Sequence, residues 1–233
     1  MFKGLGDRLI VNDDVFEWET LPESVAVFGP GLIGIELGQA LHRLGVRIRV
    51  FGRSGSLTPL SDMAIRDYAE KVFQAEFPLD TKANLHGLER EGDQVKIRFV
   101  DREDGKEKEE NFEYVLAATG RSPNVINLGL ENTSLELDSR EVPVFDPNTM
   151  QCGDSSIFIA GDVNNTMLLL HEAADEGRIA GDNAGRFPDI KSGMRRSPIS
   201  VVFCDPQIAM VGQSWGELKG QENVVVGKLS FEG

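Results

Sequence analysis

The sequence predicts an α/β fold built on a parallel β-sheet. An apolar strand, Val25–Phe28, runs into a glycine-rich turn, and an amphipathic helix follows that turn. Residues 46–51, in which apolar residues alternate with Arg before becoming wholly apolar, predict the next strand. Because a strand, a helix and a second strand in this order are typical of a parallel βαβ unit, we expect at least one α/β domain.

The composition fits a packed protein and argues against several classes of partner. Of the 233 residues 40% are hydrophobic, and the net charge is −14, from 38 acidic and 24 basic residues. Nucleic acid and anionic membranes attract basic surfaces, so neither is expected as a partner. No apolar run approaches the roughly 18 residues of a membrane span, and the N-terminus lacks the apolar core of a signal peptide. The two cysteines and three histidines are scattered, so we expect no disulfide framework, no metal site and a reducing, cytoplasmic setting.

Apolar periodicity indicates where the other elements lie. The helix after the glycine turn is expected to end at Gly45, a residue suited to a helix C-terminus. Its expected apolar face consists of Ile33, Leu37, Ala40, Leu41 and Leu44. The remaining expected elements are an extended segment at 9–16, a helix capped by Ser61 or Asp62 and reaching Phe73, a strand at 95–100, a hairpin turn at Asp104–Gly105, strands at 112–118 and 157–160, a helix at 168–184 and a strand from Pro198 to Phe203.

The glycine turn carries the clearest functional signal. It reads Val25-Ala26-Val27-Phe28-Gly29-Pro30-Gly31-Leu32-Ile33-Gly34. Gly29 permits a tight turn, Gly31 lets phosphate groups approach the main chain, and Gly34 lets the helix pack close to the sheet. The free N–H groups and the positive dipole end of the helix would face the phosphates. The turn therefore predicts a dinucleotide pyrophosphate site in a Rossmann-like domain; the alternative is a glycine loop that only turns the chain.

Three further motifs follow the glycine turn in order. They are Ala118-Thr119-Gly120-Arg121-Ser122-Pro123-Asn124, Ile157-Phe158-Ile159-Ala160-Gly161-Asp162-Val163 and Val201-Val202-Phe203-Cys204-Asp205-Pro206-Gln207-Ile208-Ala209-Met210-Val211-Gly212. Together with the glycine turn they resemble the dihydrolipoamide dehydrogenase branch of the FAD-dependent pyridine nucleotide–disulfide oxidoreductases. The resemblance covers nearly all of the chain.

The resemblance implies four parts and a longer parent protein. Residues 1–21 would end a first FAD-domain segment, 22–121 would form the NAD(P)-binding domain, 122–195 the returning FAD-domain segment, and 196–233 the start of an α+β dimerisation domain. The family's redox-active cysteine pair and its His and Glu acid/base pair are not in this chain. We therefore expect an inactive central fragment of a homodimeric enzyme, with no catalytic residue of its own.

The resemblance also assigns residues to the nicotinamide cofactor. The stretch Gly29–Gly34 would hold the pyrophosphate of NAD(P)H, and Gly120 and Arg121 would close the site from the last strand. Glu36, expected in the first helical turn, would point toward the nicotinamide–flavin junction. Two alternatives remain open: Glu36 is a carboxylate that merely favours a helix N-terminus, and Arg121 is an exposed loop cation.

A second group of residues resembles the FAD site of the family. Gly161 and Asp162 end an apolar segment, and Asp162 would bond the ribityl chain of FAD; the alternative is a carboxylate that caps the following turn. The backbone of Leu168, Leu169, Leu170 and His171 would approach the flavin. Cys204 stands where the family usually has Thr, and we expect a small buried residue there rather than a nucleophile.

The end of the second strand bears on the choice between NAD and NADP. Enzymes selective for NAD usually carry an acidic residue there for the ribose 2′-hydroxyl. This chain has Gly52 followed by Arg53, which could pair with a 2′-phosphate. The sequence therefore favours NADP as the accepted cofactor, and the alternative is that Arg53 is a solvated loop residue.

Three functions remain open at this point. The first is a flavoprotein oxidoreductase that passes electrons between NAD(P)H, FAD and a dithiol or disulfide, with small-molecule cofactors as its partners. The second is a relative that reduces another acceptor, such as mercuric ion, glutathione or oxygen. The third is a dinucleotide-binding module without redox activity, which would bind NAD(P) but no flavin.

Overall fold

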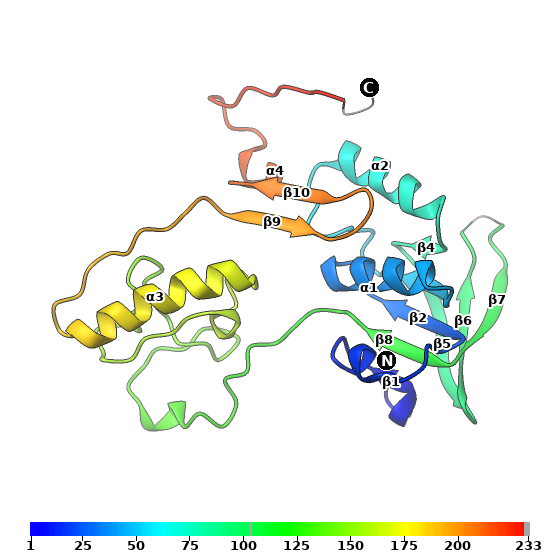
Figure 1. Cartoon of the computed structure of the whole chain (residues 1–233), viewed down its shortest axis with the longest axis horizontal. Coiled ribbons are helices and arrows are strands. Elements are labelled where there is room, and N and C mark those ends of the chain that lie inside the picture. The colour runs from blue at the N-terminus through cyan, green and yellow to red at the C-terminus, as the bar shows by residue number, and fades with distance from the viewer. Residues whose placement is uncertain (103, 231–233) are drawn as a thin grey trace. The chain divides into compact units, whose positions relative to one another are not determined.

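The computed structural model describes residues 1–102 and 104–230, and these fold into two compact units. The first unit consists of residues 1–120, 201–209 and the chain from 213 onward. The second consists of residues 121–200 and 210–212. Figure 1 shows the sheets of the first unit and the single long helix of the second.

A five-stranded parallel sheet is the centre of the first unit. Its strands are β1 (Leu9–Ile10), β2 (Ser24–Phe28), β3 (Arg47–Phe51), β4 (Leu79–Asp80) and β8 (Tyr114–Ala117). They lie in the order β1-β8-β2-β3-β4, and each neighbouring pair is parallel. In the middle of the sheet Val27 pairs with Leu116 on one side and Val50 on the other. The parallel α/β fold predicted from the sequence is confirmed.

Two helices cover one face of this sheet. They are α1 (Leu32–Arg43) and α2 (Met63–Gln74), and they share one hydrophobic core with β2 and β3. The predicted face of α1 is partly wrong, because Leu44 is 64% exposed and Ala40 is also exposed. The buried face runs instead through Ile35, Gly38 and Leu41, since Gly38 lets the helix approach Val50 closely.

A three-stranded antiparallel sheet covers the other face. Its strands, in spatial order, are β5 (Asn84–Glu91), β6 (Gln94–Val100) and β7 (Glu107–Phe112). Aromatic rings join the two sheets: the ring centroids of Phe28 and Phe51 are 5.2 Å apart, and those of Phe51 and Phe99 are 5.3 Å apart. The first unit therefore has three layers, helices, parallel sheet and antiparallel sheet (Figure 1).

The strand predicted at 112–118 is two strands that belong to different sheets. Phe112 pairs with Val95 in the antiparallel sheet, whereas Tyr114 pairs with Val25 in the parallel sheet. Glu113 lies between them, and its amide donates to both the carbonyl and the hydroxyl oxygen of Ser24. An apolar run in the sequence does not show this change of sheet, because both strands bury apolar side chains.

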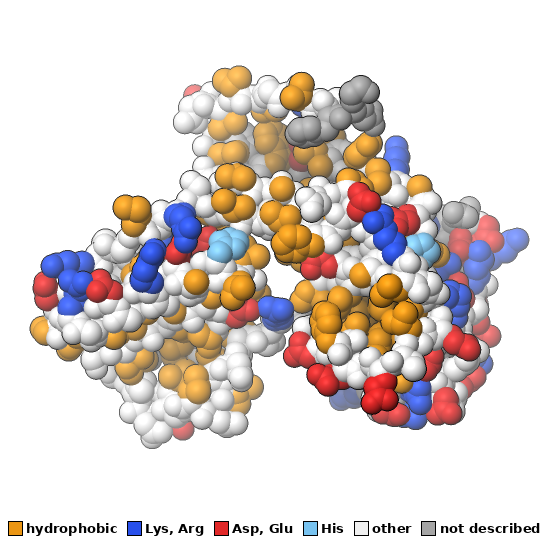
Figure 2. Space-filling model, viewed as in Figure 1, with side chains coloured by type: hydrophobic (Ala, Val, Ile, Leu, Met, Phe, Trp, Pro, Cys, Tyr) orange, Lys and Arg blue, Asp and Glu red, His pale blue; other side chains and the backbone are white. Residues whose placement is uncertain are grey.

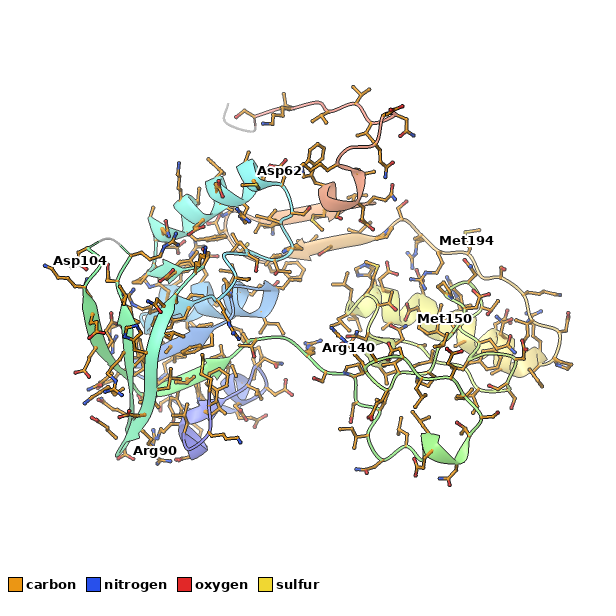
Figure 3. All side chains as sticks on the ribbon, turned by 180° about the vertical axis from the view of Figure 1, so that it is seen from behind. Asp62, Arg90, Asp104, Arg140, Met150 and Met194 are labelled. Atoms are coloured by element: carbon orange, nitrogen blue, oxygen red, sulfur yellow. The ribbon has the colours of Figure 1, made fainter. Side chains whose placement is uncertain are left out.

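Local signals correctly placed the start of α2 and the end of α1, whereas α3 (Leu170–Arg186) lies two residues beyond its predicted bounds of 168–184. Asp62 caps α2, accepting from the amides of Ala64 at 2.8 Å and Ile65 at 3.0 Å (Figure 3). Gly45 follows α1 with a φ of +94°, the left-handed conformation of a helix C-terminus. By contrast, the segment at 9–16 is extended only in β1, and Asp14–Glu17 form a 3₁₀ helix.

The second unit is built around α3 (Leu170–Arg186). Met150 packs on the helix with Ile179 and Ala180 (Figure 3). The strand predicted at 157–160 is wrong: among the described residues this segment makes only an isolated bridge, between Gln151 and Phe158. It forms a narrow hairpin with residues 150–152 instead of entering a sheet.

The last part of the chain forms a small hairpin and a short helix. The hairpin consists of β9 (Ile199–Val202) and β10 (Ile208–Val211), and α4 (Trp215–Leu218) follows with Ser214 and Glu217 as a capping box. Val202, Cys204 and Ile208 contribute to the core beside α1 and α2. The predicted strand from Pro198 to Phe203 is confirmed as β9.

The surface is strongly charged. Figure 2 shows acidic and basic side chains mixed over the antiparallel sheet and a gathering of hydrophobic side chains over the N-terminal segment, where Val11, Phe16 and Leu21 are exposed. Within residues 1–102 and 104–230, no helix has the length and apolar character needed to cross a membrane.

Candidate functional site

The structure explains each of the three glycines in the turn between β2 and α1 differently. Gly29 has a φ of +106°, and a Cβ there would collide with the carbonyl oxygen of Ala118. A Cβ on Gly34 would collide with the carbonyl oxygen of Gly29. Nothing lies within 4 Å of the place where a Cβ of Gly31 would be. Two glycines are therefore required by the protein itself, whereas the third leaves open space beside the main chain, as a pyrophosphate needs.

The N-terminus of α1 points its free amides toward this space. Gly31 is the N-cap residue and offers no side chain to the first amides of the helix. The first turn contains no acidic residue that would repel an anion. The structure thus has room, free donors and a positive helix end for a phosphate group, next to Pro30, Leu32 and Ile33.

Glu36 lies beyond the first turn of α1, contrary to the prediction, because the helix begins at Leu32. Its carboxylate accepts a hydrogen bond of 2.8 Å from the amide of Phe203. Three residues further along α1, the side chain of Gln39 donates a hydrogen bond to the carbonyl of Asp205 and accepts one from its amide. These bonds attach residues 203–205 to α1.

Gly52, directly after β3, is fixed by sterics. A Cβ there would lie 2.5 Å from the carbonyl oxygen of Thr81 and 2.7 Å from Cγ of Pro30. No side chain, acidic or otherwise, fits at this position without moving backbone atoms. The absence of a ribose-binding carboxylate at position 52 is thus built into the packing of the turn.

The turn after β3 is joined to the turn after β4 by three backbone hydrogen bonds. They run from Gly52 to Asp80, from Gly55 to Thr81 and from Ala83 to Gly52, at 2.6, 2.8 and 2.8 Å. Ser54 and Ser56 bring their hydroxyl oxygens within 2.5 Å of each other. This bonding places Lys82 beside the segment that carries Arg53, and a Cβ on Gly55 would lie 3.8 Å from Cδ of Lys82.

The turns after β3 and β4 carry two exposed cations and one buried carboxylate. Arg53 and Lys82 are exposed, and across residues 1–102 and 104–230 neither side chain has an ion pair or hydrogen bond. Asp80 is buried, and its carboxylate accepts from the amide of Lys82 at 3.0 Å and from Arg102 at 3.4 Å. Burial has the largest effect on the Asp80 carboxyl and raises its pKa. The amide of Lys82 and the charge of Arg102 act in the opposite direction.

The motif that follows β8 is divided between the two units. Ala118 donates to the carbonyl of Phe28 at 2.8 Å and so continues the sheet toward the glycine turn. Gly120 has a φ of +117° and ends the first unit. Arg121 begins the second unit, where its guanidinium pairs with the carboxylate of Asp162 at 2.8 Å.

Arg121 and Asp162 line a small cavity of about 120 Å³ in the second unit. Val163, Asn165 and Leu168 are among its other lining residues. The sequence assigned Arg121 and Asp162 to different cofactors, and only the structure brings them together. The half-exposed carboxylate of Asp162 leaves it accessible to a hydroxyl-bearing ligand.

The start of α3 offers backbone donors near this cavity. Leu169 is the N-cap residue of α3, without a side-chain hydrogen bond to the first amides. Leu170 is 87% exposed, and His171 is exposed with its Nε2 3.8 Å from Glu172. The side chain of His171 is therefore not held in place for proton transfer.

A turn in the left-handed region precedes Asp162. Gly161 has a φ of +78°, and a Cβ there would lie 3.3 Å from the Cβ of Ala173. The Gly161 amide donates to the buried carboxylate of Glu176 at 2.8 Å. Sequence reasoning missed Glu176, although Glu172, Asp175 and Glu176 fall on one helical face with Ile179, a pattern that marks charged groups held by partners.

The cysteines are unsuited to redox exchange with a substrate. Cys152 and Cys204 are free, buried and in different units. Burial raises the pKa of both thiols, so the reactive thiolate is disfavoured at neutral pH. The prediction that Cys204 is a small buried residue is confirmed by its 5% exposure. Throughout the described part of the chain, no cluster of three or more His, Cys, Asp or Glu side chains could hold a metal ion.

Comparison with known proteins identifies the class to which this fold and these turns belong. Residues 2–177 match the family described as pyridine nucleotide-disulphide oxidoreductase, and the chain belongs to that family. A dihydrolipoyl dehydrogenase of Chlamydia pneumoniae is 32% identical over 216 residues, which is 92% of this chain and 45% of that protein. Dihydrolipoyl dehydrogenase 2 of Haloarcula marismortui is 32% identical over 228 residues, 94% of this chain and 46% of the relative.

Solved structures agree with this assignment. LpdA from Mycobacterium tuberculosis superimposes with a TM-score of 0.74 at 27% identity, covering 91% of this chain and 45% of LpdA. The HOCl-induced flavoprotein disulfide reductase RclA of Escherichia coli has a TM-score of 0.76 at 19% identity over 92% of this chain and 48% of RclA, a likeness of fold alone. The chain spans about half the length of the curated relatives that it matches.

Proposed function

We propose that this chain is the pyridine-nucleotide-binding part of a flavoprotein disulfide oxidoreductase similar to dihydrolipoyl dehydrogenase. In that reaction electrons pass between NAD(P)H, FAD and a dithiol–disulfide pair. The observation that carries the proposal is the turn at Gly29–Gly34, where contacts within the protein require Gly29 and Gly34 while the space beside Gly31 is open. A glycine loop that only turned the chain would have no need of a glycine at position 31.

Each unit has its own proposed ligand. In the first unit the pyrophosphate of NAD(P)H lies on the amides of Gly31, Leu32 and Ile33, with Gly120 at the end of the neighbouring strand. Glu36 is proposed to lie near the nicotinamide, and the Phe203 amide would hold its carboxylate by the bond of 2.8 Å. The domain bounds inferred from the sequence, with the nucleotide-binding domain at 22–121, are part of this proposal.

In the second unit the proposed ligand is FAD. Asp162 accepts from hydroxyl groups of the ribityl chain, and Gly161 and the amides at the start of α3 complete the site. FAD supplies the two-electron redox chemistry when it is bound. The residues of this chain would bind and orient the two cofactors. Binding of the ribityl chain at Asp162 would either break the ion pair between Arg121 and Asp162 or leave Arg121 bound beside the hydroxyl groups.

NADP is the proposed nicotinamide cofactor. The steric exclusion of any carboxylate at Gly52 removes the group that selects NAD, and Arg53 is an exposed cation without a partner in the described residues. Lys82 adds a second free cation, and Ser54 adds a hydroxyl donor. In a chain of net charge −14, two free cations and a hydroxyl donor on adjoining turns suit the dianionic 2′-phosphate of NADP.

The setting of the whole protein is also proposed. The full-length enzyme is a homodimer of the cytoplasm that has small molecules as its other partners. Buried, unpaired cysteines fit a reducing compartment.

The test is a titration of the chain with NADPH and, separately, with FAD, followed by backbone amide chemical shifts. NADPH should shift the amides of Gly31, Leu32, Ile33 and Arg53, because these groups face the proposed ligand. FAD should shift those of Gly161 and Asp162. Absence of any NADPH response at the glycine turn contradicts the proposal, and absence of any FAD response at Gly161 and Asp162 contradicts its flavin part.

A further inference from the structure

Glu176, in the second unit, is a buried acidic residue that is only 1% exposed. It lies on α3, and one of its oxygens accepts two hydrogen bonds, from the amide of Gly161 at 2.8 Å and from the side-chain amide of Asn164 at 2.6 Å. Gly161 begins the turn that contains Asp162, and Asn164 is the last residue of the 3₁₀ helix within it. A single side chain therefore fixes that turn at two points.

The turn needs such a fixed point because its backbone is unusual. Gly161 has φ +78° and ψ −163°, a conformation that only glycine adopts readily. Asn165, at the other end, has a φ of +57°. Asn164 is itself buried, and its side-chain oxygen accepts from the amide of Thr166 at 2.9 Å, so the link extends through the whole turn.

The charge of Glu176 is balanced by Arg195. The guanidinium of Arg195 donates to the second oxygen of Glu176 at 3.1 Å and to Glu172 at 3.0 Å. Glu172 is as deeply placed as Glu176, with side-chain exposures of 5% and 1%. Glu172 has no hydrogen bond to the Gly161–Asn165 turn among the described residues. A buried carboxylate without a partner is strongly disfavoured, and Arg195 supplies a partner for the oxygen of Glu176 that does not bind the turn.

We propose that Glu176 is the positioning residue for Asp162, and that Arg195 holds the Glu176 side chain in place by binding its second oxygen. The inference rests on the proposed function, because Asp162 is the group assigned to the ribityl chain of FAD. Glu176 touches neither cofactor: it acts by fixing the backbone from which Asp162 projects. Residues 191–196, which carry Arg195, thereby contribute to the flavin site without contacting it.

The experiment compares three variants of the chain, Glu176→Ala, Glu176→Gln and Glu172→Ala. Glu172→Ala is the matched control. It removes the other buried carboxylate that accepts from Arg195, and Glu172 makes no hydrogen bond to the turn among the described residues. Exchange of the Gly161 amide with solvent measures the turn directly, and quenching of flavin fluorescence measures FAD affinity. Overall unfolding in urea, recorded for each variant, separates a general loss of stability from a local one.

Glu176→Ala should speed exchange at Gly161 and weaken FAD binding by about tenfold or more, since a charge-assisted acceptor is lost. Glu172→Ala should lower stability and leave both readouts at the wild-type value. Glu176→Gln retains an acceptor oxygen for Gly161 and Asn164 and should restore most of the protection.

Equal exchange at Gly161 in Glu176→Ala and Glu172→Ala overturns the assignment, as does a failure of Glu176→Gln to restore protection. A wild-type chain that binds no FAD contradicts the flavin role proposed for Asp162. It does not decide the role of Glu176 in the turn, which amide exchange measures without any cofactor.

Discussion

The turn at Gly29–Gly34 and the turn at Gly161–Asn165 each begin with a glycine at positive φ, yet the protein fixes them by different means. The first is held by the main chain: Gly29 donates to the carbonyl of Phe51 at 2.8 Å, and its surroundings leave no room for a Cβ. The second is held by the side chain of Glu176. A turn beside a regular sheet can thus be fixed by positions that admit no side chain, whereas a turn in an irregular unit is fixed by a charged side chain.

The surroundings explain the difference. In the first unit, neighbouring parallel strands already satisfy the backbone groups on both sides of the turn. In the second unit, the described residues before Asp162 make only isolated bridges, and the buried carboxylate of Glu176 on α3 supplies the acceptor. The first turn should therefore be broken by adding a methyl group and the second by removing a carboxylate.

The largest effect is expected for Gly34→Ala. The added Cβ would collide with the carbonyl oxygen of Gly29, and neither backbone can yield without disturbing the sheet. We expect a loss of about 3 kcal/mol in the free energy of unfolding, at the upper end of overpacking costs. Urea denaturation followed by tryptophan fluorescence measures it, because Trp18 and Trp215 both belong to the first unit. A loss below about 0.5 kcal/mol would show that the turn tolerates side chains after all.

A smaller effect is expected for Arg53→Ala, which tests whether a side-chain charge in the first unit contributes to NADPH affinity. Loss of one charge-assisted bond to a phosphate should weaken NADPH binding about tenfold and leave NADH binding nearly unchanged. Lys82→Ala should have the same direction and a smaller size, since Lys binds phosphate as a flexible point charge. Fluorescence titration with each nucleotide measures both. Equal affinity for NADPH and NADH in wild type, or an Arg53→Ala variant that matches wild type, rejects the 2′-phosphate assignment.

The smallest effect is expected below about pH 4, in the second unit. Hydrogen bonding to Arg196 lowers the pKa of Asp175 below its usual value of 3.8. A lowered carboxyl pKa contributes stability above the unfolded pKa, and this contribution is lost as the pH falls through the folded pKa. Asp175→Asn should therefore flatten the acid dependence of amide protection in α3. An Asp175→Asn variant with the acid dependence of the wild type would contradict this prediction.

The sequence predicts local features of this fold well. The glycine turn, the Asp62 cap and the end of α1 at Gly45 each depend on residues within a few positions of one another. Features that depend on distant segments were missed. Gly52 excludes side chains because of Thr81, and the division of 112–118 between two sheets depends on pairing with Val25 and Val95.

The candidate site shows the same limit. Sequence motifs identified Arg121 and Asp162 singly, but only the folded second unit reveals their 2.8 Å ion pair. Glu176 belongs to no motif used in the prediction, because its role is to hold another residue's backbone. The acidic residues at 172, 175 and 176 on the buried face of α3 were the signal that could have found it.

The measurement that tests the account most directly is NADPH affinity and unfolding free energy of the same Gly31→Val variant. The φ of −91° at Gly31 suits any residue, and among the described residues nothing lies within 4 Å of the place of a Cβ. We expect a free energy of unfolding within about 1 kcal/mol of wild type and a loss of NADPH affinity of about a hundredfold or more, because valine would occupy the phosphate space. A Gly31→Val protein that binds NADPH as wild type does would contradict the assignment of this turn to the pyrophosphate.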